Sequence, residues 1–513
     1  MPLRHQPPTL QKAAMTVIAN HFERLCYNCT SQHRMAALIN SEEYLQFEGP
    51  FVDMPTGVLE SMMETICERR ALHRRHLHIL LQKQLQKLTL SFGIGDAYHG
   101  FEFMKERCKN LRQLNISYLR HINPSVLMGL VPCFSKLVSL NLRMTLTVDQ
   151  LLGQIGLACP DLLELNLAGT PVTDKGMVQL CVAEDGRRLC QNLRRLIVTD
   201  TAISTAGATV VVQSLPNLRE FDYDHIFDVL ELVEQWDKGL ESRLLMGAGV
   251  RLSAEPIVPP SQLSLRTLIS AAEYVPMQGL DAATRLCPET RTVTLSNAWL
   301  PSAALYKLMV MQHLTSISLT NCDGLSLDFH EGVLPLLTVC GHQLQNLILV
   351  NFTSVDITGI GKACPDLYNL AFSSIAEFEP VGQLCDKWFN RLHALELWSD
   401  PHADLSPYLI RQLLLFSPNM TNMLFKGCEV LSDKLMADIW EVNPMPKLSH
   451  FTLDHCHAIT AESLHHMLSA DNELAVLRVW SCINITKCHH IELVHRIKDE
   501  NLDVYLEWFG YDD

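Results

Sequence analysis

The sequence predicts a solenoid, a stack of short repeats that shares one continuous core. A pattern of the form L-x-x-L-x-L recurs from Leu85 to a last copy that starts at Leu474. The 513 residues would make roughly three ordinary domains, whereas a stack of repeats has no such size limit because each repeat contacts only its neighbours. The chain is 48% hydrophobic and 19% charged, which supplies a core and excludes a mostly disordered protein.

Residues 1–84 do not show the repeat and are expected to be helical. One amphipathic face has helical spacing, and its members are Leu10, Ala14, Val17, Ile18 and Phe22. A second helical region is expected from about Thr56 to Lys83, after Met54-Pro55, since a helix accepts proline in its first turn. Such helices can serve as a cap, because the first repeat would otherwise expose its apolar end.

The repeats occupy the rest of the chain, residues 85–513. Their starts lie 23 to 31 residues apart within each run, on or just beyond the leucine-rich-repeat period. Fourteen good copies start at Leu85, Leu111, Leu137, Leu162, Leu193, Leu218, Thr290, Leu314, Leu344, Leu367, Leu392, Met420, Leu448 and Leu474. A poorer copy starts at Leu265, so we expect about 14 or 15 repeats.

Cysteine flanks these copies at two fixed places. It stands three residues before the first apolar position at Cys108, Cys159, Cys190, Cys287 and Cys364, and three residues after the last at Cys322, Cys428, Cys456 and Cys482. A small, weakly polar thiol fills the turn of a coil where larger groups would clash, so burial is expected. In the N-terminal half, Thr170 and Thr201 stand where cysteine is expected three residues after the last apolar position. We therefore expect the curvature of the repeats to differ between the two halves.

These residues resemble the cysteine-containing leucine-rich repeats of F-box and related substrate receptors, from about Leu85 to Cys482. The resemblance implies an α/β leucine-rich-repeat solenoid. Such a solenoid is a horseshoe with a parallel sheet on its concave face and helices outside.

Two segments depart from the repeat. Asp222 to about Gln262 breaks the period: Phe227–Leu245 has helix-like spacing, and the prolines and glycines of 247–260 predict an exposed loop that is either functional or disordered. At the other end, Leu502–Trp508 alternates apolar and other residues and predicts a last strand that covers the edge of the solenoid.

The N-terminal segment carries a second resemblance. Thr9-Leu10, followed by Ala14 and Ile18, is similar to the elongin-C-binding box, in which a small residue, usually Cys, stands four positions after the leucine. The stretch that contains Met54-Pro55 is similar to the short cullin-contacting element, or to the Leu-Pro opening of an F-box. The resemblance implies that an adaptor, either elongin B/C with cullin-2 or a Skp-type adaptor with cullin-1, is bound by Leu10, Ala14, Ile18, Met54 and Pro55. Leu10 would be the anchor of a helix docked in a groove.

The strand period indicates which residues face the concavity. Side chains alternate across a strand, so the residues around the second and third apolar positions point outward. In the later repeats these are Ala394, Glu396, Trp398, Asn422, Leu424, Lys426, His450, Thr452, Asp454, Val476, Arg478 and Trp480.

Trp and Arg are enriched at interface hot spots, which makes part of this set the predicted partner-binding surface. Its members are Trp398, Leu424, Lys426, Arg478 and Trp480. The alternative is that Trp398 packs on a loop and that the C-terminal tail covers Trp480. In an earlier repeat Glu220, Asp222 and Asp224 form an acidic cluster, which favours a basic segment on the partner.

No residue pattern predicts catalysis, a metal site or a cofactor. His21, Cys26, Cys29 and His33 are zinc-ligand types but lack the spacing of a common finger, and Cys456 occupies the buried repeat position. A scattered Ser/His/Asp triad would leave no motif. The phosphate-loop, zinc-protease and nucleophile-elbow patterns do not occur.

Composition and charge limit the classes of partner and the cellular location that we expect. The chain has 41 Lys and Arg against 56 Asp and Glu, a net charge of −15, which argues against nucleic acid. No uncharged apolar stretch reaches about 18 residues, which argues against a membrane span. Seventeen cysteines without a secretory signal indicate thiols in the cytoplasm, with the nucleus as the other location.

The sequence therefore predicts a non-enzymatic substrate receptor of a cullin ubiquitin ligase. The alternative is a leucine-rich scaffold or signalling protein with no ligase connection, whose N-terminal helices are only a cap.

Overall fold

The computed structural model describes residues 2–4, 9–26, 50–68, 74–90, 97–236, 238–249, 262–322, 326–380, 385, 387–399 and 405–510. The chain divides into two compact units. One is Pro8–Leu265, and the other is Arg266–Asp513 together with Met1–Pro7.

The unit Pro8–Leu265 contains six parallel strands of three residues each, counted over its described part. They are β1 (Lys87–Thr89), β2 (Gln113–Asn115), β3 (Ser139–Asn141), β4 (Glu164–Asn166), β5 (Arg195–Ile197) and β6 (Glu220–Asp222). The middle residue of each is the second apolar position of a repeat and is buried. The repeat motif therefore sets the strand position.

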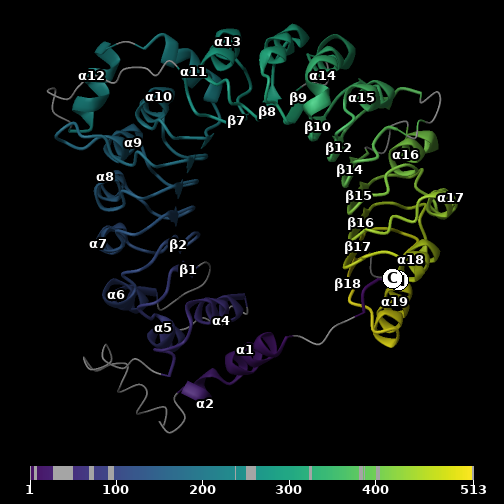
Figure 1. The fold of residues 1–513 in the computed structure, drawn as a ribbon, viewed down its shortest axis with the longest axis horizontal. Coiled ribbons are helices and arrows are strands. Elements are labelled where there is room, and N and C mark those ends of the chain that lie inside the picture. Colours follow the sequence, from purple (N-terminus) through teal and green to yellow (C-terminus); the bar gives the residue numbers. More distant parts are fainter. Residues whose placement is uncertain are drawn as a thin grey trace. The chain divides into compact units, whose positions relative to one another are not determined.

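Helices lie on one side of these strands (Figure 1). They are α6 (Ala97–Arg107), α7 (Pro124–Leu130), α8 (Asp149–Ala158), α9 (Asp174–Cys181) and α10 (Thr205–Ser214). Before them come α1 (Leu10–Asn20), α2 (Phe22–Cys26), α4 (Thr56–Glu68) and α5 (Arg74–Leu80), and after them α11 (Ile226–Glu234) and α12 (Lys238–Gly247). Within the helical region expected over Thr56–Lys83, the structure describes α4 and α5, and residues 69–73 between them lie outside the described residues.

The segment that breaks the period is partly helical. α11 packs on α10, and α12 packs on α9. These two helices account for most of Phe227–Leu245, the segment for which the spacing predicted helix. The loop expected around residues 250–261 lies outside the described residues.

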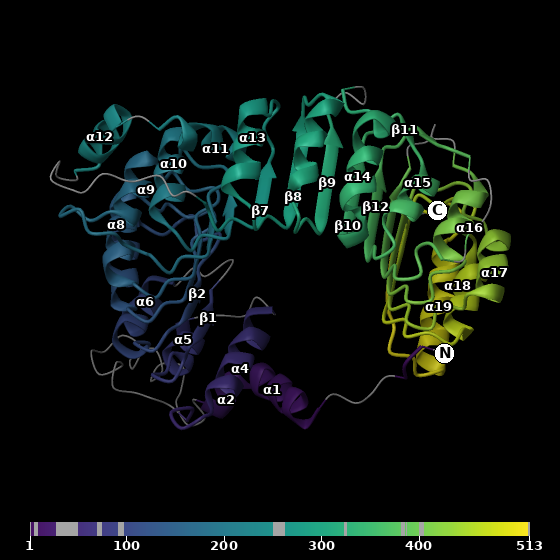
Figure 2. The ribbon, with the colours of Figure 1, turned by 45° about the horizontal axis from the view of Figure 1, so that its top comes forward.

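The second unit has longer strands, and Figure 2 shows β7 to β10 side by side. The main sheet of its described part runs through β7 (Thr267–Ser270), β8 (Thr292–Ala298), β9 (Ser316–Asn321), β10 (Asn346–Val350), β12 (Asn369–Ser373), β14 (Ala394–Trp398), β15 (Asn422–Lys426), β16 (His450–Asp454), β17 (Val476–Trp480) and β18 (Tyr505–Phe509). β11 (Ser354–Val355) pairs with β13 (Glu377–Phe378) in a small second sheet. Every neighbouring pair is parallel.

Helices and helical turns connect these strands. They are α13 (Met277–Leu286), η3 (Ser302–Val310), η4 (Phe329–Val333), α14 (Leu334–Cys340), η5 (Gly341–Gln343), α15 (Ile357–Ala363), α16 (Pro407–Leu414), α17 (Asp433–Val442), α18 (Ala461–Ser469) and α19 (Lys487–Asp499). The prediction of an α/β leucine-rich-repeat solenoid is confirmed by this strand and helix order. The expected last strand is β18, which starts three residues later than the alternation indicated.

The core combines the repeat positions with apolar residues of the helices. All three apolar positions of the fourteen copies and of the poorer copy at Leu265 are buried. No described helix has both the length and the apolar character that crossing a bilayer requires.

The flanking cysteines are buried with one exception. Cys322 is exposed, so the expectation that it fills a coil turn is wrong. Asn321, which is buried, fills that turn instead: its amide group donates to the Leu327 carbonyl (3.0 Å), and Ser326 Oγ donates to its side-chain oxygen (2.9 Å). Where the N-terminal half has threonine, the hydroxyl bonds locally, as Thr170 Oγ1 does to the Leu167 carbonyl (2.6 Å).

Candidate interaction surfaces

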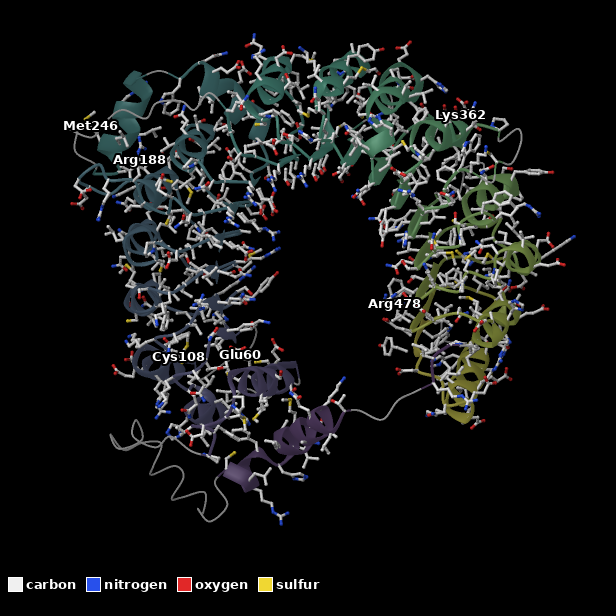
Figure 3. All side chains as sticks on the ribbon, in the orientation of Figure 1. Glu60, Cys108, Arg188, Met246, Lys362 and Arg478 are labelled. Atoms are coloured by element: carbon white, nitrogen blue, oxygen red, sulfur yellow. The ribbon has the colours of Figure 1, made fainter. Side chains whose placement is uncertain are left out.

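One candidate surface lies on the sheet of β14–β18, on the face opposite the helices. We call it the open face and define it by the first, third and fifth residues of these five strands. Figure 3 shows one of its members, Arg478, pointing away from the helices. The alternation predicted from the sequence therefore holds, because the second and fourth residues of β14–β17 are buried in the core.

The fifth residues of the strands form one linked row. Strand register places Trp398, Lys426, Asp454, Trp480 and Phe509 side by side. Lys426 Nζ lies 5.1 Å from the centroid of the Trp398 ring and 3.2 Å from Asp454 Oδ2. The ammonium group is therefore held between an aromatic face and a carboxylate.

The third residues form a second row, which contains Glu396, Leu424, Thr452, Arg478 and Glu507. Arg478 Nε donates to Glu507 Oε2 at 3.1 Å, so this charge is also paired within the sheet. Thr452 lies on this face but is buried, since Leu424 and Arg478 flank it on the neighbouring strands. The expectation that Thr452 faces solvent is wrong for that reason.

The predicted aromatic residues differ in access. Trp398 is 42% exposed, whereas Trp480 is only partly accessible and has Phe509 of β18 beside it. Phe509 is 70% exposed, and Tyr505 on the same strand is exposed as well. The same alternation, continued from β17 into β18, places Tyr505 and Phe509 on the open face, so the sequence carries a signal for both residues.

The predicted adaptor-binding helix is α1. Thr9 caps it, because its hydroxyl accepts from the Lys12 N–H (3.2 Å). Leu10 is 87% exposed, and Ala14 and Val17 are exposed too. At spacings of four and three residues these three share one helix face, which we call the α1 stripe.

The other face of this segment is buried. Met15 and Phe22 are buried, Ile18 is partly buried, and α1 packs against α4. The single apolar face predicted from Leu10 to Phe22 is thus divided, with one part in contact with the unit and the α1 stripe facing out. The reason is that Phe22 belongs to α2, a separate helix that begins after α1 ends.

Met54 and Pro55 lie at the start of α4. The Pro55 carbonyl accepts from Val58 N (3.0 Å) and Leu59 N (3.1 Å), and its ring is exposed, whereas Met54 is partly buried. Gln84 Nε2 donates to the Met54 carbonyl at 3.1 Å and ties the loop to the chain before β1.

The helix that follows covers a sheet edge. Glu60 Oε1 in α4 accepts from the backbone N–H of Gln86 (3.0 Å) and of Lys87 (2.7 Å), so it satisfies donors at the start of β1. α4 therefore contributes to capping, whatever else the segment binds.

The acidic cluster is partly neutralised. Arg195 Nε lies 3.0 Å from Glu220 Oε2. Burial and the neighbouring Asp224 carboxylate raise the pKa of Asp222 above its ordinary value. The pairing with Arg195 therefore offsets part of the negative charge of the cluster.

Two of the cysteines considered as metal ligands or nucleophiles, Cys26 and Cys456, have raised pKa values. Cys456 is buried, its Sγ donates to the Phe425 carbonyl (3.5 Å), and its contact with the Cys428 thiol together with burial raises its pKa. Burial raises the pKa of Cys26 to about 12. Cys29 and His33 lie outside the described residues, and within the described ranges no three His, Cys, Asp or Glu side chains gather to hold a metal.

Comparison with known proteins gives one short family match. Residues 158–181 match a leucine-rich-repeat model. No curated protein matches the chain. The chain therefore carries leucine-rich repeats, as its strands and helices also show.

Solved structures give distant likenesses. A chain of the yeast Rad7 and Elc1 complex is 14% identical with a TM-score of 0.42, and the match covers 94% of this chain and 96% of that chain. A chain of the TLR13–ssRNA13 complex is 16% identical with a TM-score of 0.41, covering 78% and 52%. A leucine-rich-repeat protein of Leptospira interrogans is 14% identical with a TM-score of 0.38, covering 85% and 92%. Likenesses at this level carry no inference about partners.

Proposed function

We propose that this leucine-rich-repeat interaction protein is a substrate-recognition subunit of a cullin-RING ubiquitin ligase. In this proposal α1 docks elongin C of an elongin B/C–cullin-2 assembly, and the open face binds the target protein. The chain performs no chemistry itself; it holds a target near the ligase.

The observation that supports this function most is the α1 stripe. Leu10, Ala14 and Val17 remain exposed on a capped helix although the same helix buries Met15 on its other side. An amphipathic helix that leaves one apolar face free is suited to docking in a groove. The stripe also contains the leucine and the small residue through which the segment resembles the elongin-C-binding box.

The first prediction concerns Leu10. Burying a leucine side chain that is 87% exposed stabilises a complex by about 2 kcal/mol, which is roughly thirtyfold in affinity. Leu10→Asp should therefore weaken binding to purified elongin B/C by at least about thirtyfold. Isothermal titration calorimetry with the full chain measures this change.

The matched control is Gln11→Asp, which adds the same charge to an exposed neighbour in the same helix. It should leave the affinity within about threefold, a change below 1 kcal/mol. A parallel titration with a Skp-type adaptor tests the other docking mode, in which Met54 and Pro55 would be the contacts. Equal affinities for wild type and Leu10→Asp, or no binding to elongin B/C, would show that the docking assignment is wrong.

A further inference from the structure

At the β14 edge of the open face, the size of the side chains changes abruptly between β12 and β14. Register places Ser373 beside Trp398 and Ala371 beside Glu396. On β10, the next strand along, Ile348 lies beside Ala371 and is itself exposed. The side chains of Ser373 and Ala371 are too short to cover the Trp398 indole. The surface next to the ring is therefore lower on the β12 side.

The other side of the ring is occupied. Lys426 lies over it at 5.1 Å and is balanced by Asp454 at 3.2 Å. Trp398 is 42% exposed, and its neighbour on β12 in the register is the short side chain of Ser373. An aromatic ring attracts cations through the negative potential of its face, and one face of this indole already holds one.

Glu396 is the carboxylate nearest to this exposed ring in the register. It is exposed, and no cation of the described chain pairs with it in this structure. The other charges of the open face are paired, Lys426 with Asp454 and Arg478 with Glu507. The unpaired charge of the open face is thus negative. It belongs to Glu396, which stands two residues before Trp398 in β14.

These groups together fit one kind of side chain. An arginine could stack its guanidinium on Trp398, donate to Glu396 and lay its methylenes on Ala371 and Ile348. A phosphate group would meet the unpaired carboxylate and no free cation, so nucleic acid or a phosphopeptide would be repelled. The net charge of −15 also favours a basic partner over an acidic one.

We propose that Glu396, Trp398, Ala371 and Ile348 form a recognition pocket for an arginine side chain in a basic segment of the target protein. This arginine pocket rests on the proposed function only in taking the open face as the target-binding surface, and it needs no adaptor. It names the chemical class of the segment that the receptor holds.

The test uses the full chain without any adaptor. A fluorescein-labelled glycine/serine peptide with two arginines is titrated by fluorescence anisotropy, beside the same peptide with citrulline in place of arginine. Citrulline keeps the shape and loses the charge. The arginine peptide should bind at least about tenfold more tightly, and Glu396→Gln and Trp398→Leu should each reduce its affinity about fivefold or more.

Two matched variants separate the pocket from a general attraction to an acidic protein. Glu377→Gln removes the same charge from an exposed residue of β13, outside the open face, and should leave the affinity unchanged. Trp398→Phe keeps an aromatic face and should retain more binding than Trp398→Leu. Equal binding of both peptides, or equal losses in Glu396→Gln and Glu377→Gln, would overturn the pocket. Neither result depends on whether Leu10→Asp abolishes elongin C binding.

Discussion

At the scale of single residues, the buried thiols do what the sequence pattern predicts. Cys159 Sγ donates to the Phe134 carbonyl and Cys428 Sγ to the Leu397 carbonyl, each at 3.6 Å, so each thiol satisfies a carbonyl of the preceding repeat. The repeat pattern did not predict that Asn321 fills the turn in place of Cys322. Asn321 can do so because β9 extends to it, and the repeat pattern does not specify the length of a strand.

These thiols also make stability depend on pH. Burial raises the pKa of Cys287 from 9.0 to about 12, so the folded state keeps the thiol neutral where the unfolded chain would lose its proton. The stabilisation is fully present below pH 9 and decreases as the pH rises from there toward 12. For one such group the loss at pH 10.5 is about 2 kcal/mol.

We therefore predict that Cys287→Ser, which removes the titrating group, loses less stability than wild type between pH 8 and pH 10.5. Urea unfolding followed by circular dichroism at both pH values measures the difference. For each protein, the free energy of unfolding at pH 10.5 is compared with its own value at pH 8. A lower stability of the variant at pH 8 therefore does not affect the comparison. A variant with the same decrease as wild type would mean that other groups dominate the alkaline loss.

At the scale of helices and strands, carboxylates join successive repeats. Asp433, the first residue of α17, accepts from Thr460 N (3.1 Å) and Thr460 Oγ1 (2.8 Å), and also from Ser463 Oγ. Asp149 accepts from Thr173 N and Oγ1 in the same way, at 2.9 and 2.7 Å. The repeat pattern predicted where helices follow strands but not these bonds, because their partners are 24 to 30 residues apart and show no spacing of their own.

Asp433→Ala should therefore be strongly destabilising. It removes a charged acceptor of three donors and leaves the Thr460 N–H without its partner, which should cost about 3 kcal/mol. Asp438→Ala in the same helix is the control. Asp438 pairs with Arg411 at 3.3 Å on the surface, and such pairs contribute about 0–1 kcal/mol. Urea midpoints that fall equally in both variants would contradict the role of Asp433.

At the scale of the whole solenoid, alternation predicts which way a side chain points but not how accessible it is. It placed Trp398, Thr452 and Trp480 on one face, yet Trp398 is exposed, Thr452 is buried and Trp480 is intermediate. Accessibility depends on the size of side chains on adjacent strands, which lie about one repeat away in the sequence. The arginine pocket arises in this way, because the small residues Ala371 and Ser373 of β12 lie beside Glu396 and Trp398 of β14. No single repeat contains its signal.

The same architecture predicts how a local defect spreads. In a repeat stack each unit contacts mainly its neighbours, so lost stability should remain near the lesion. Within the unit that contains Arg266–Asp513, Asp433→Ala should speed backbone amide hydrogen exchange in α17, β16 and α18, because its three lost bonds join the first and last of these. β8 and α13 lie several strands away in the sheet order and should exchange as in wild type.

Hydrogen exchange with mass spectrometry resolves these segments in one experiment. Asp438→Ala, which loses only a surface pair, should change neither region. Faster exchange throughout the unit in Asp433→Ala would instead indicate a single cooperative core, in which every repeat unfolds with its most distant neighbour. A localised response would mean that each repeat can be altered separately, so that substitutions in the arginine pocket on β14 report on binding rather than on the stability of the stack.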